Sequence, residues 1–291
     1  MLSDIADDPR FCGTLPPGRY FDLETPYGYG GPLSDGPISE SSQRRFMNEF
    51  GEYARSKGIV SQFVRFHPLL MNHESAPLLF ETRYLHDTVC IDTASPEIIM
   101  KNMDSKNRNM VRKAQKNGIS IERVPVEEYG AFLPIYRETM EKDNASGYFF
   151  FNEEYFKAQS GLKDNACIFY ARKDGQIIAG AIMYFNDRFM HYHLAGTVTR
   201  YRPFAPSNLL LYEAACQAAG MGIKKFHLGG GMTDNDGLFG FKKQFNKNGR
   251  LPFVIGRTVL DSGQFKALTR LRKKLDAGFD ENNSRMIPYR A

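Results

Sequence analysis

Residues 166–196 constrain the fold most, because they have the pattern of three consecutive strands joined by two tight turns. The β-rich runs ACIFYAR, QIIAGAIMYF and RFMHYHLAG are separated by Lys173-Asp174-Gly175 and by Asn186-Asp187. An Asp-Gly pair between two such runs is a strong hairpin signal. The sequence therefore predicts an antiparallel meander whose last strand leads into residues 197–245.

That following segment combines a polar loop, a small-residue helix predicted over residues 208–221, and a further strand. A strand–loop–helix–strand unit leaves backbone N–H groups at the start of the helix, which suits an anionic ligand. Ser207 is the predicted N-cap of this helix. Arg200 and Arg202 precede it, where guanidinium charge and helix dipole would act together on a phosphate. Surface solubility is the alternative role of these arginines.

The run Gly229-Gly230-Gly231 after the strand invites a nucleotide-loop interpretation, which the flanking residues exclude. Position 234 is Asp where the dinucleotide fingerprint has its third glycine, and no Gly-Lys-Ser/Thr follows at phosphate-loop spacing. Asp234 and Asp236 imitate part of a calcium loop, but the remaining ligand positions are missing. The glycines are better interpreted as a turn.

His191 and His193 alternate along a predicted strand, so both face one side of the sheet. A metal site would need a third ligand, and none is evident, so no metal is expected. Packing or hydrogen bonding is the usual role of such histidines, and a catalytic role, for which we select His193, is the alternative.

The segment LFGFKKQF, residues 238–245, places the pair Lys242-Lys243 among three phenylalanines. A lysine held among aromatic rings near a strand end can be positioned against an anion or a developing oxyanion. We therefore select Lys242 as a catalytic candidate and Phe241 as its neighbour in the substrate site. A solvent-facing lysine pair on a helix is the alternative.

The N-terminal half offers two weaker candidates for ligand contacts. Tyr27 and Tyr29 lie in the glycine-rich run TPYGYGGP, which either crosses a sheet as a structural loop or lines a ligand site. Residues 78–93 predict a hairpin that turns at His86-Asp87. Residues 95–118 predict one helix with a basic second half, in which Arg112 and Lys113 bind an anion or form a solvated face.

Length and charge set the limits of these interpretations. The chain of 291 residues is long enough for two domains, and we place the boundary between residues 124 and 125, where Pro125 separates a strand from a helix. A net charge of +5 permits an anionic substrate, but the sequence lacks the dense basic stripe of a dedicated nucleic-acid binder.

The four widely spaced cysteines are expected to be reduced thiols. We expect a cytoplasmic protein without a transmembrane segment, which leaves peripheral membrane contact open.

Several of these motifs together resemble the FemAB-like branch of the GNAT acyltransferase superfamily. The resemblance rests on KNMDSKNRNMVRKAQKNGISI, on an AGT strand end, and on a strand ending in GGG before LFGFKKQF, and it covers roughly residues 101–260. It implies an α/β (α+β) fold with two GNAT-like lobes, each a mixed, mainly antiparallel sheet flanked by helices, with the cleft between them. The lobes would be residues 1–124, with residues 262–291 packed back on them, and residues 125–261.

Proteins of this branch build peptidoglycan interpeptide bridges by moving amino acids from aminoacyl-tRNA onto a cell-wall precursor. The resemblance thus implies an aminoacyltransferase without a bound cofactor, in which Lys242 stabilises the transition state or substrate phosphates. The acceptor would be an amine of a cell-envelope precursor, an amino sugar or a peptide. Two departures keep the donor open: the branch's helical hairpin insertion is missing, and RYRPFAPSN replaces the R/Q-x-x-G-x-G/A loop of acetyl-CoA enzymes. Acyl-CoA is the alternative donor, and a binding module without activity is the alternative of another class.

Overall fold

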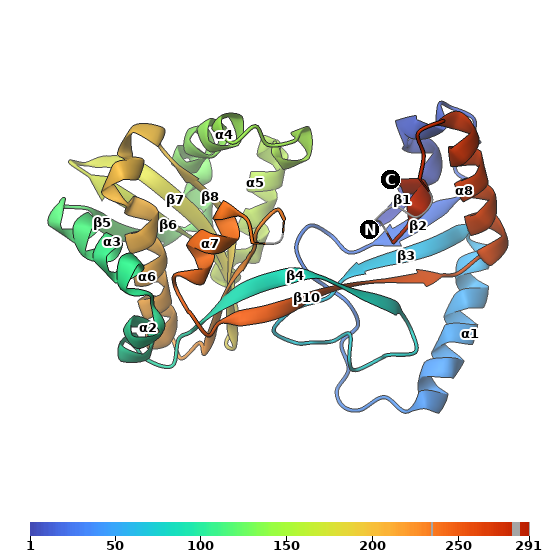
Figure 1. Ribbon diagram of the computed structural model, residues 1–291, viewed down its shortest axis with the longest axis horizontal. Helices are drawn as coiled ribbons and strands as arrows, with labels where there is room; N and C mark the ends of the chain where they lie inside the picture. Colours follow the sequence, from blue (N-terminus) through green and yellow to red (C-terminus); the bar gives the residue numbers. More distant parts are fainter. Residues whose placement is uncertain (234, 281–285, 291) are drawn as a thin grey trace. The chain divides into compact units, whose positions relative to one another are not determined.

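The computed structural model describes residues 1–233, 235–280 and 286–290 (Figure 1). Contacts divide the chain into two units, residues 1–86 with 252–291, and residues 87–251. Asp234, considered above as part of a calcium loop, lies outside the described residues. So do residues 281–285 and 291 of the segment 262–291 that was predicted to pack on the first lobe. Each unit contains a mainly antiparallel sheet flanked by helices, as expected for the fold class.

The first unit is built on a small sheet with the strand order β1-β2-β3-β10. Its strands are β1 (Leu2–Asp4), β2 (Phe21–Glu24), β3 (Ile59–Arg65) and β10 (Arg250–Val259). Strands β2 and β3 pair in parallel, whereas β1 pairs with β2 and β3 pairs with β10 in antiparallel fashion. Helices α1 (Glu40–Ser56) and α8 (Ser262–Leu275) flank this sheet, and Leu268 of α8 packs with Ile5 and Phe11 near the N-terminus.

The second unit has the strand order β4-β9-β8-β7-β6-β5. These strands are β4 (Glu81–Asp92), β5 (Ser120–Pro125), β6 (Ala166–Lys173), β7 (Gln176–Phe185), β8 (Phe189–Thr197) and β9 (Lys225–Gly230). The meander predicted over residues 166–196 is confirmed as β6, β7 and β8. Asp174 and Gly175 form its first turn with φ of 49° and 78°, the positive values that a two-residue hairpin turn requires.

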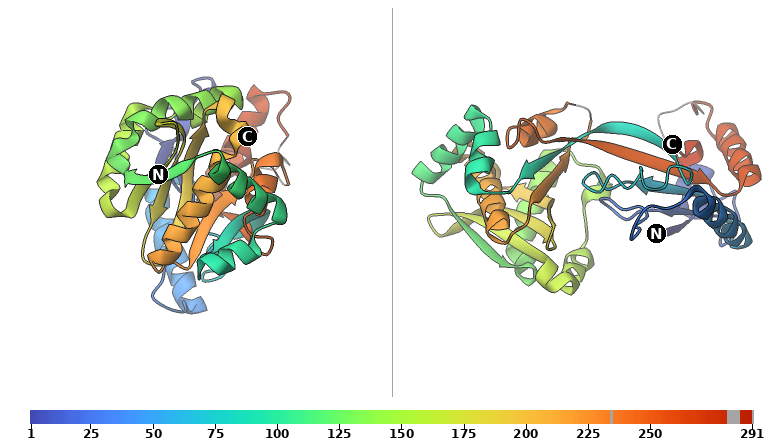
Figure 2. Two further views of the ribbon diagram at one scale, coloured as in Figure 1. Left: turned by 90° about the vertical axis from the view of Figure 1, so that its left-hand side faces the viewer. Right: turned by 90° about the horizontal axis from the view of Figure 1, so that it is seen from below.

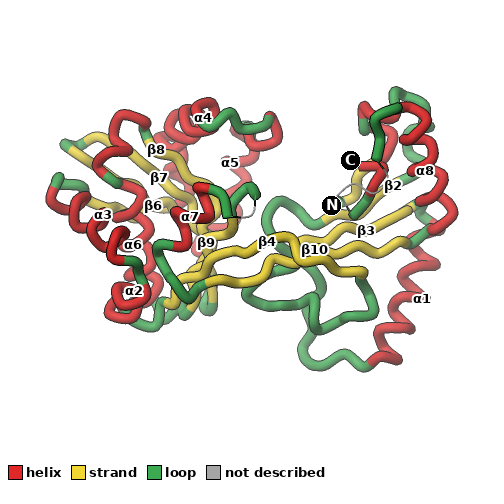
Figure 3. The backbone as a smooth tube through the Cα atoms, in the orientation of Figure 1, coloured by secondary structure: helices red, strands yellow, loops and turns green. Residues whose placement is uncertain are grey.

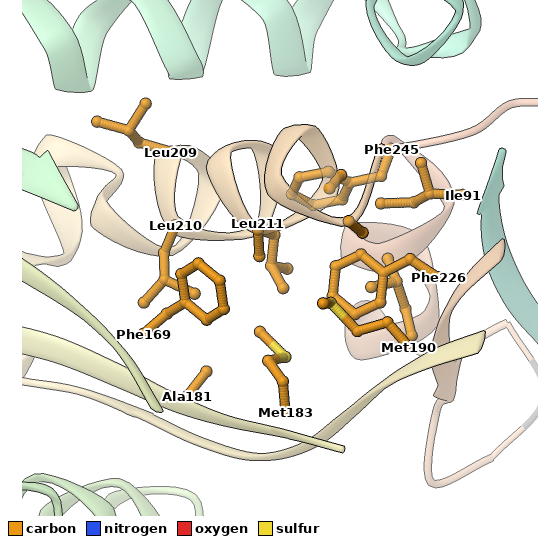
Figure 4. Packing of buried hydrophobic residues seen from close by; sticks show 14 of the residues in the cluster. Ile91, Phe169, Ala181, Met183, Met190, Leu209, Leu210, Leu211, Phe226 and Phe245 are labelled. Carbon is orange, nitrogen blue, oxygen red and sulfur yellow. The ribbon is translucent and has the colours of Figure 1, made fainter. Parts of the chain in front are cut away.

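Helices cover both faces of this second sheet (Figures 2 and 3). They are α2 (Pro96–Asn102), α3 (Ser105–Lys116), α4 (Phe132–Lys142), α5 (Glu153–Gln159), α6 (Pro206–Gly220) and α7 (Gly237–Lys243). Helix α6 packs on one face, where Leu210 and Leu211 point toward Phe169 and Met183 of the sheet (Figure 4). Helices α4 and α5 pack on the other face, in a separate core around Phe132 and Phe156.

Three local predictions were wrong. Residues 81–92 form the single strand β4 instead of a hairpin, because His86-Asp87 lacks the glycine that a tight two-residue turn favours. The helix predicted over residues 95–118 breaks between α2 and α3, where Asp104 begins a second helix. Ser207 is not the N-cap of α6, since the cap position is Ala205.

The division by contacts also differs from the boundary expected between residues 124 and 125. Strand β5 pairs with β6 along its whole length, up to Pro125 opposite Cys167. Ile99 of α2 and Val111 of α3 are buried in the same core as Leu210 of α6. Residues 87–124 therefore belong with the second unit.

Candidate active site

The parallel strands β8 and β9 pair over only three positions and then part. The paired residues are Phe189 with Lys225, Met190 with Phe226, and His191 with His227. Beyond that point β8 continues to Thr197 and β9 to Gly230, and no further pair joins them in the described part of the chain. Beyond this point the backbone N–H and C=O groups that β8 and β9 would turn toward each other need other hydrogen-bond partners. The ends of the two strands can therefore hydrogen-bond to a ligand.

A β-bulge shapes β8 at the same place. Ile182 pairs with Leu194 and Met183 pairs with Tyr192, so His193 is the extra residue that opposes no partner on β7. Tyr192 packs against the core beneath α6, whereas Tyr184, the partner of His191, packs against the core beneath α4 and α5. Consecutive strand residues thus reach both faces of the sheet where β8 and β9 part.

The turn after β9 and the start of α7 are organised by one carboxylate. Asp236 is the N-cap of α7 and accepts hydrogen bonds from the backbone N–H groups of Met232, Thr233 and Phe239 at 2.6, 3.0 and 2.8 Å. These bonds hold the pKa of Asp236 below its usual range, against the opposing effect of burial. A Cβ on Gly231 would lie 2.2 Å from its Oδ1, so the turn requires a glycine there.

Helix α7 delivers Lys242 to the end of β9. Its Nζ donates to the carbonyl of Gly230 at 2.6 Å and lies 5.7 Å from the centre of the Tyr192 ring. The residue is only 7% exposed, and this burial lowers the pKa of the ammonium group to about 8, with the Asp236 carboxylate acting in the opposite sense. Near neutral pH Lys242 is therefore a mostly protonated, buried cation that gives up its proton easily.

His193 lies on the opposite face of the sheet, inside an aromatic cluster. Its Nε2 is 2.5 Å from the hydroxyl of Tyr155 on α5, and its ring stacks on Tyr184 at 4.2 Å between centroids. Burial lowers the pKa of His193 to about 4, so the imidazole is neutral at physiological pH. A neutral imidazole can exchange a proton with a hydroxyl, or it can simply hold Tyr155 in place.

Three kinds of comparison relate this chain to known proteins. Residues 103–243 match the model of an acetyltransferase (GNAT) domain. That part of the chain is similar to a GNAT acetyltransferase domain. No curated protein is similar enough in sequence to match the chain.

Solved structures extend the likeness in fold to most of the chain. FemX is similar with a TM-score of 0.62 and 15% identity, over 86% of this chain and 83% of that one. The C-terminal domain of a putative lysylphosphatidylglycerol synthetase from Agrobacterium fabrum follows with 0.57 and 16%, over 89% and 82%. L-PGS from Bacillus licheniformis gives 0.52 and 15%, over 89% and 83%. At these identities the likeness concerns the fold, and the expected resemblance to the FemAB-like branch is confirmed at that level.

The remaining predicted site residues of the matched region surround the start of α6. The hydroxyls of Ser207 and Thr197 lie 2.7 Å apart, so Ser207 fastens the helix to the end of β8. Arg200 and Arg202 are exposed in the short 3₁₀ segment Thr199–Phe204 before the helix. The first turn of α6 has no side-chain cap, so its N–H groups suit an anionic ligand.

The other predicted contacts are more scattered. Arg112 and Lys113 are exposed on α3, which packs beside α6. Phe241 packs edge-on against Phe245, within the core beneath α6. Tyr27 and Tyr29 belong to the other unit; Tyr27 is exposed, and the ring of Tyr29 packs edge-on against Phe253. Burial raises the pKa of the Tyr29 phenol.

Sequence reasoning missed Asp236, Tyr192 and Tyr155 as parts of the site. A signal existed for Asp236, because an Asp two residues before the first apolar residue of a helix has the N-cap pattern. Tyr192 and Tyr155 had none, since only the tertiary structure brings them against Lys242 and His193.

The described residues contain neither a membrane-spanning helix nor a metal-binding cluster. None of the helices is both long enough and apolar enough to cross a membrane. No group of three or more His, Cys, Asp or Glu side chains is arranged so that it could hold a metal ion, again within the residues that the structure describes.

Proposed function

We propose that the protein is an N-acyltransferase that moves an amino acid from aminoacyl-tRNA to an amine of a cell-envelope precursor. The observation that carries this proposal is Lys242, a buried cation held at the point where β8 and β9 part. Two of the structures with a similar fold are FemX and a domain of a putative lysylphosphatidylglycerol synthetase. This likeness favours aminoacyl transfer over acetyl transfer. The cytoplasmic location stays a prediction.

In this proposal the acceptor amine attacks the ester carbonyl carbon of the donor. The C–N bond forms, a tetrahedral oxyanion develops, and the bond from carbon to the ribose oxygen breaks as the intermediate collapses. The Lys242 ammonium has three N–H donors, one of which the Gly230 carbonyl accepts. Donation from this ammonium to the oxyanion, in a site shielded from water, stabilises the transition state more than the ground state.

The donor is tested by incubating the purified protein with radiolabelled aminoacyl-tRNA or acetyl-CoA and a set of amine acceptors. Label that reaches an acceptor only from charged tRNA, and that ribonuclease abolishes, supports the proposal. Transfer from acetyl-CoA would support the second candidate, an acyl-CoA-dependent N-acyltransferase, which the match to an acetyltransferase model and the uncapped start of α6 favour. Tight binding of an acceptor without transfer from either donor would identify a binding module.

The pKa of Lys242 predicts how the activity depends on pH. Because burial lowers that pKa to about 8, the ammonium form is present below pH 8 and is lost as the pH rises through this value. If the cation stabilises the oxyanion, kcat/KM falls along an alkaline limb with an apparent pKa near 8. Lys242→Arg retains its charge over this range and should lack the limb. A limb of the same midpoint in Lys242→Arg would assign it to another group.

Helix α3 is the proposed docking face for the RNA of the donor. It spans Ser105–Lys116 without any carboxylate, and its cations include Arg112 and Lys113, which are both exposed. The double variant Arg112→Glu/Lys113→Glu should raise KM for aminoacyl-tRNA about tenfold or more and reduce the salt dependence of binding. A minimal donor that carries only the terminal aminoacyl nucleotide should be used equally well.

The matched control for this variant is Lys266→Glu/Arg270→Glu on α8, which also reverses two exposed charges on a helix. The α3 and α8 double variants change the net charge by the same amount. A loss of tRNA affinity in the α3 variant alone therefore locates the RNA-binding face. Equal losses in both double variants would show that only the total charge matters.

A further inference from the structure

Helices α4 and α5 and the segment that joins them (Figure 1) line a pocket of about 190 Å³. Most of its wall is apolar and consists of Leu133, Tyr136, Phe150, Phe151 and Phe156. For comparison, an apolar cavity of ~150 Å³ is large enough to bind benzene. The pocket therefore has room for one aromatic ring with a small substituent.

The aromatic wall is held in place by contacts with residues that do not line the pocket. The Tyr136 hydroxyl donates to the backbone carbonyl of Phe149 at 2.7 Å. The Phe151 ring stacks on the Tyr155 ring with 4.2 Å between centroids and 16° between planes. Asn152 is the N-cap of α5, where its Oδ1 accepts from the N–H of Tyr155 at 3.0 Å. Both ends of the joining segment are thus fixed, so the pocket is preformed, as most ligand sites are.

The two polar side chains of the pocket, Arg137 and Asn152, both offer hydrogen-bond donors. Arg137 is exposed on α4 and belongs to none of the ion pairs within the described part of the chain. Its neighbour Glu138 instead accepts from the backbone N–H of Thr199 at 2.8 Å. Because the Oδ1 of Asn152 already caps α5, its NH₂ group supplies the further donors. No acidic side chain of the described residues lines the pocket.

We propose that this pocket binds a small aromatic anion, with the ring against the apolar wall and the acidic group on the Arg137 guanidinium. A carboxylate or phosphate can accept two parallel N–H···O bonds from one guanidinium, which matches the charge that the pocket leaves without a counter-ion. Phe150 is 43% exposed, so the pocket opens to solvent beside this ring and a ligand can enter the folded protein.

Two kinds of ligand share this chemistry, an aromatic carboxylate and a nucleotide whose base enters the pocket while its phosphate reaches Arg137. Both present a flat ring of a size that the pocket can hold and an anion next to it. The inference goes beyond the proposed acyl transfer and does not depend on it. A binding result therefore stands whether or not the protein transfers an acyl group.

Ligand-detected NMR titrations of the full-length protein test the pocket without any acyl donor. Phenylacetate and AMP are the anionic probes, benzyl alcohol is the neutral one, and benzylamine is the cationic one. We expect at least one anion to bind about tenfold or more tightly than benzyl alcohol, because a charge-assisted hydrogen bond adds to the same ring contacts. Benzylamine should show no saturable binding.

The order of the two anions identifies the source of the ligand. Tighter binding of phenylacetate supports the proposal for an aromatic carboxylate, and tighter binding of AMP supports it for a nucleotide. Benzyl alcohol that binds as tightly as both anions would overturn the proposal, as would the absence of saturable binding by either anion.

Three variants locate the binding in this pocket. Arg137→Gln should weaken binding of the preferred anion by ~10–100-fold and leave that of benzyl alcohol unchanged. Leu133→Trp fills the pocket and should abolish binding of every probe. Lys142→Gln removes another cation of α4, one that does not line the pocket, and is the matched control with wild-type affinities.

Thermal unfolding of the same samples confirms that each variant is folded. Arg137 is exposed, so its variant tests the site even if Leu133→Trp does not fold. Wild-type affinity for the anion in Arg137→Gln would show that the anion binds elsewhere and would overturn the proposal. An equal loss of affinity in Lys142→Gln would do the same, because total charge alone would then explain the binding.

Discussion

Lys242→Ala is expected to lower kcat/KM by ~10–1000-fold while the fold stays intact. The lysine side chain holds a charge against the Gly230 carbonyl and the face of Tyr192, at the place where we expect the oxyanion to form. Alanine removes the charge, and the ground-state contacts of the substrate remain. Transfer kinetics should be compared with circular dichroism and thermal unfolding of the same samples.

Two further variants separate chemistry from stability at this position. Lys243→Ala, the next residue of the same helix, is the matched control and should keep most of the activity. Lys242→Met fills a similar volume without the charge, and because burying an ammonium group costs free energy, it should unfold at a higher temperature than the wild type while remaining as inactive as the alanine variant. An active Lys242→Met enzyme would remove the lysine from the mechanism.

Gly231→Ala is expected to have the second largest effect, although it adds a single methyl group. The new Cβ would lie 2.2 Å from Oδ1 of Asp236, so this carboxylate must move away from the three backbone N–H groups that it accepts. Leaving such bonds unmade costs about 1–3 kcal/mol. Since the same carboxylate begins the helix that carries Lys242, a shift of about 1 Å should also lower kcat/KM by ~100-fold.

Gly240→Ala is the matched control in the same segment. Apart from its chain neighbours and the backbone of its own helix, no heavy atom of the described residues lies within 4 Å of a Cβ at this position. Alanine is also preferred over glycine inside a helix by about 1 kcal/mol. This variant should therefore be slightly more stable than the wild type and fully active. Chemical denaturation gives the two free energies of unfolding, and transfer assays give the activities. Equal behaviour of the two glycine variants would show that Asp236 does not position Lys242.

The parts of this molecule that could be predicted are those with a local cause. The turn Asp174-Gly175 determines its own backbone conformation, so the meander that contains it was predicted with its strands in the right order. The motif around Lys242 was likewise recognisable, because its residues lie next to one another in the chain. The turn predicted at His86-Asp87 was wrong because that pair lacks the glycine that a tight turn favours. The cap predicted at Ser207 was wrong because its hydroxyl lies 2.7 Å from that of Thr197, a contact that only the tertiary structure provides.

The site itself depends on contacts between residues far apart in the chain. His191 and His227 are separated by 36 positions, so no spacing in the sequence could show that they pair where β8 and β9 part. The sequence alone predicted the fold class and the resemblance to GNAT proteins, and it selected Lys242 as a candidate. Only the tertiary structure decided which residues surround that lysine, because burial, which lowers its pKa, and strand register, which pairs the histidines, are properties of the packed chain.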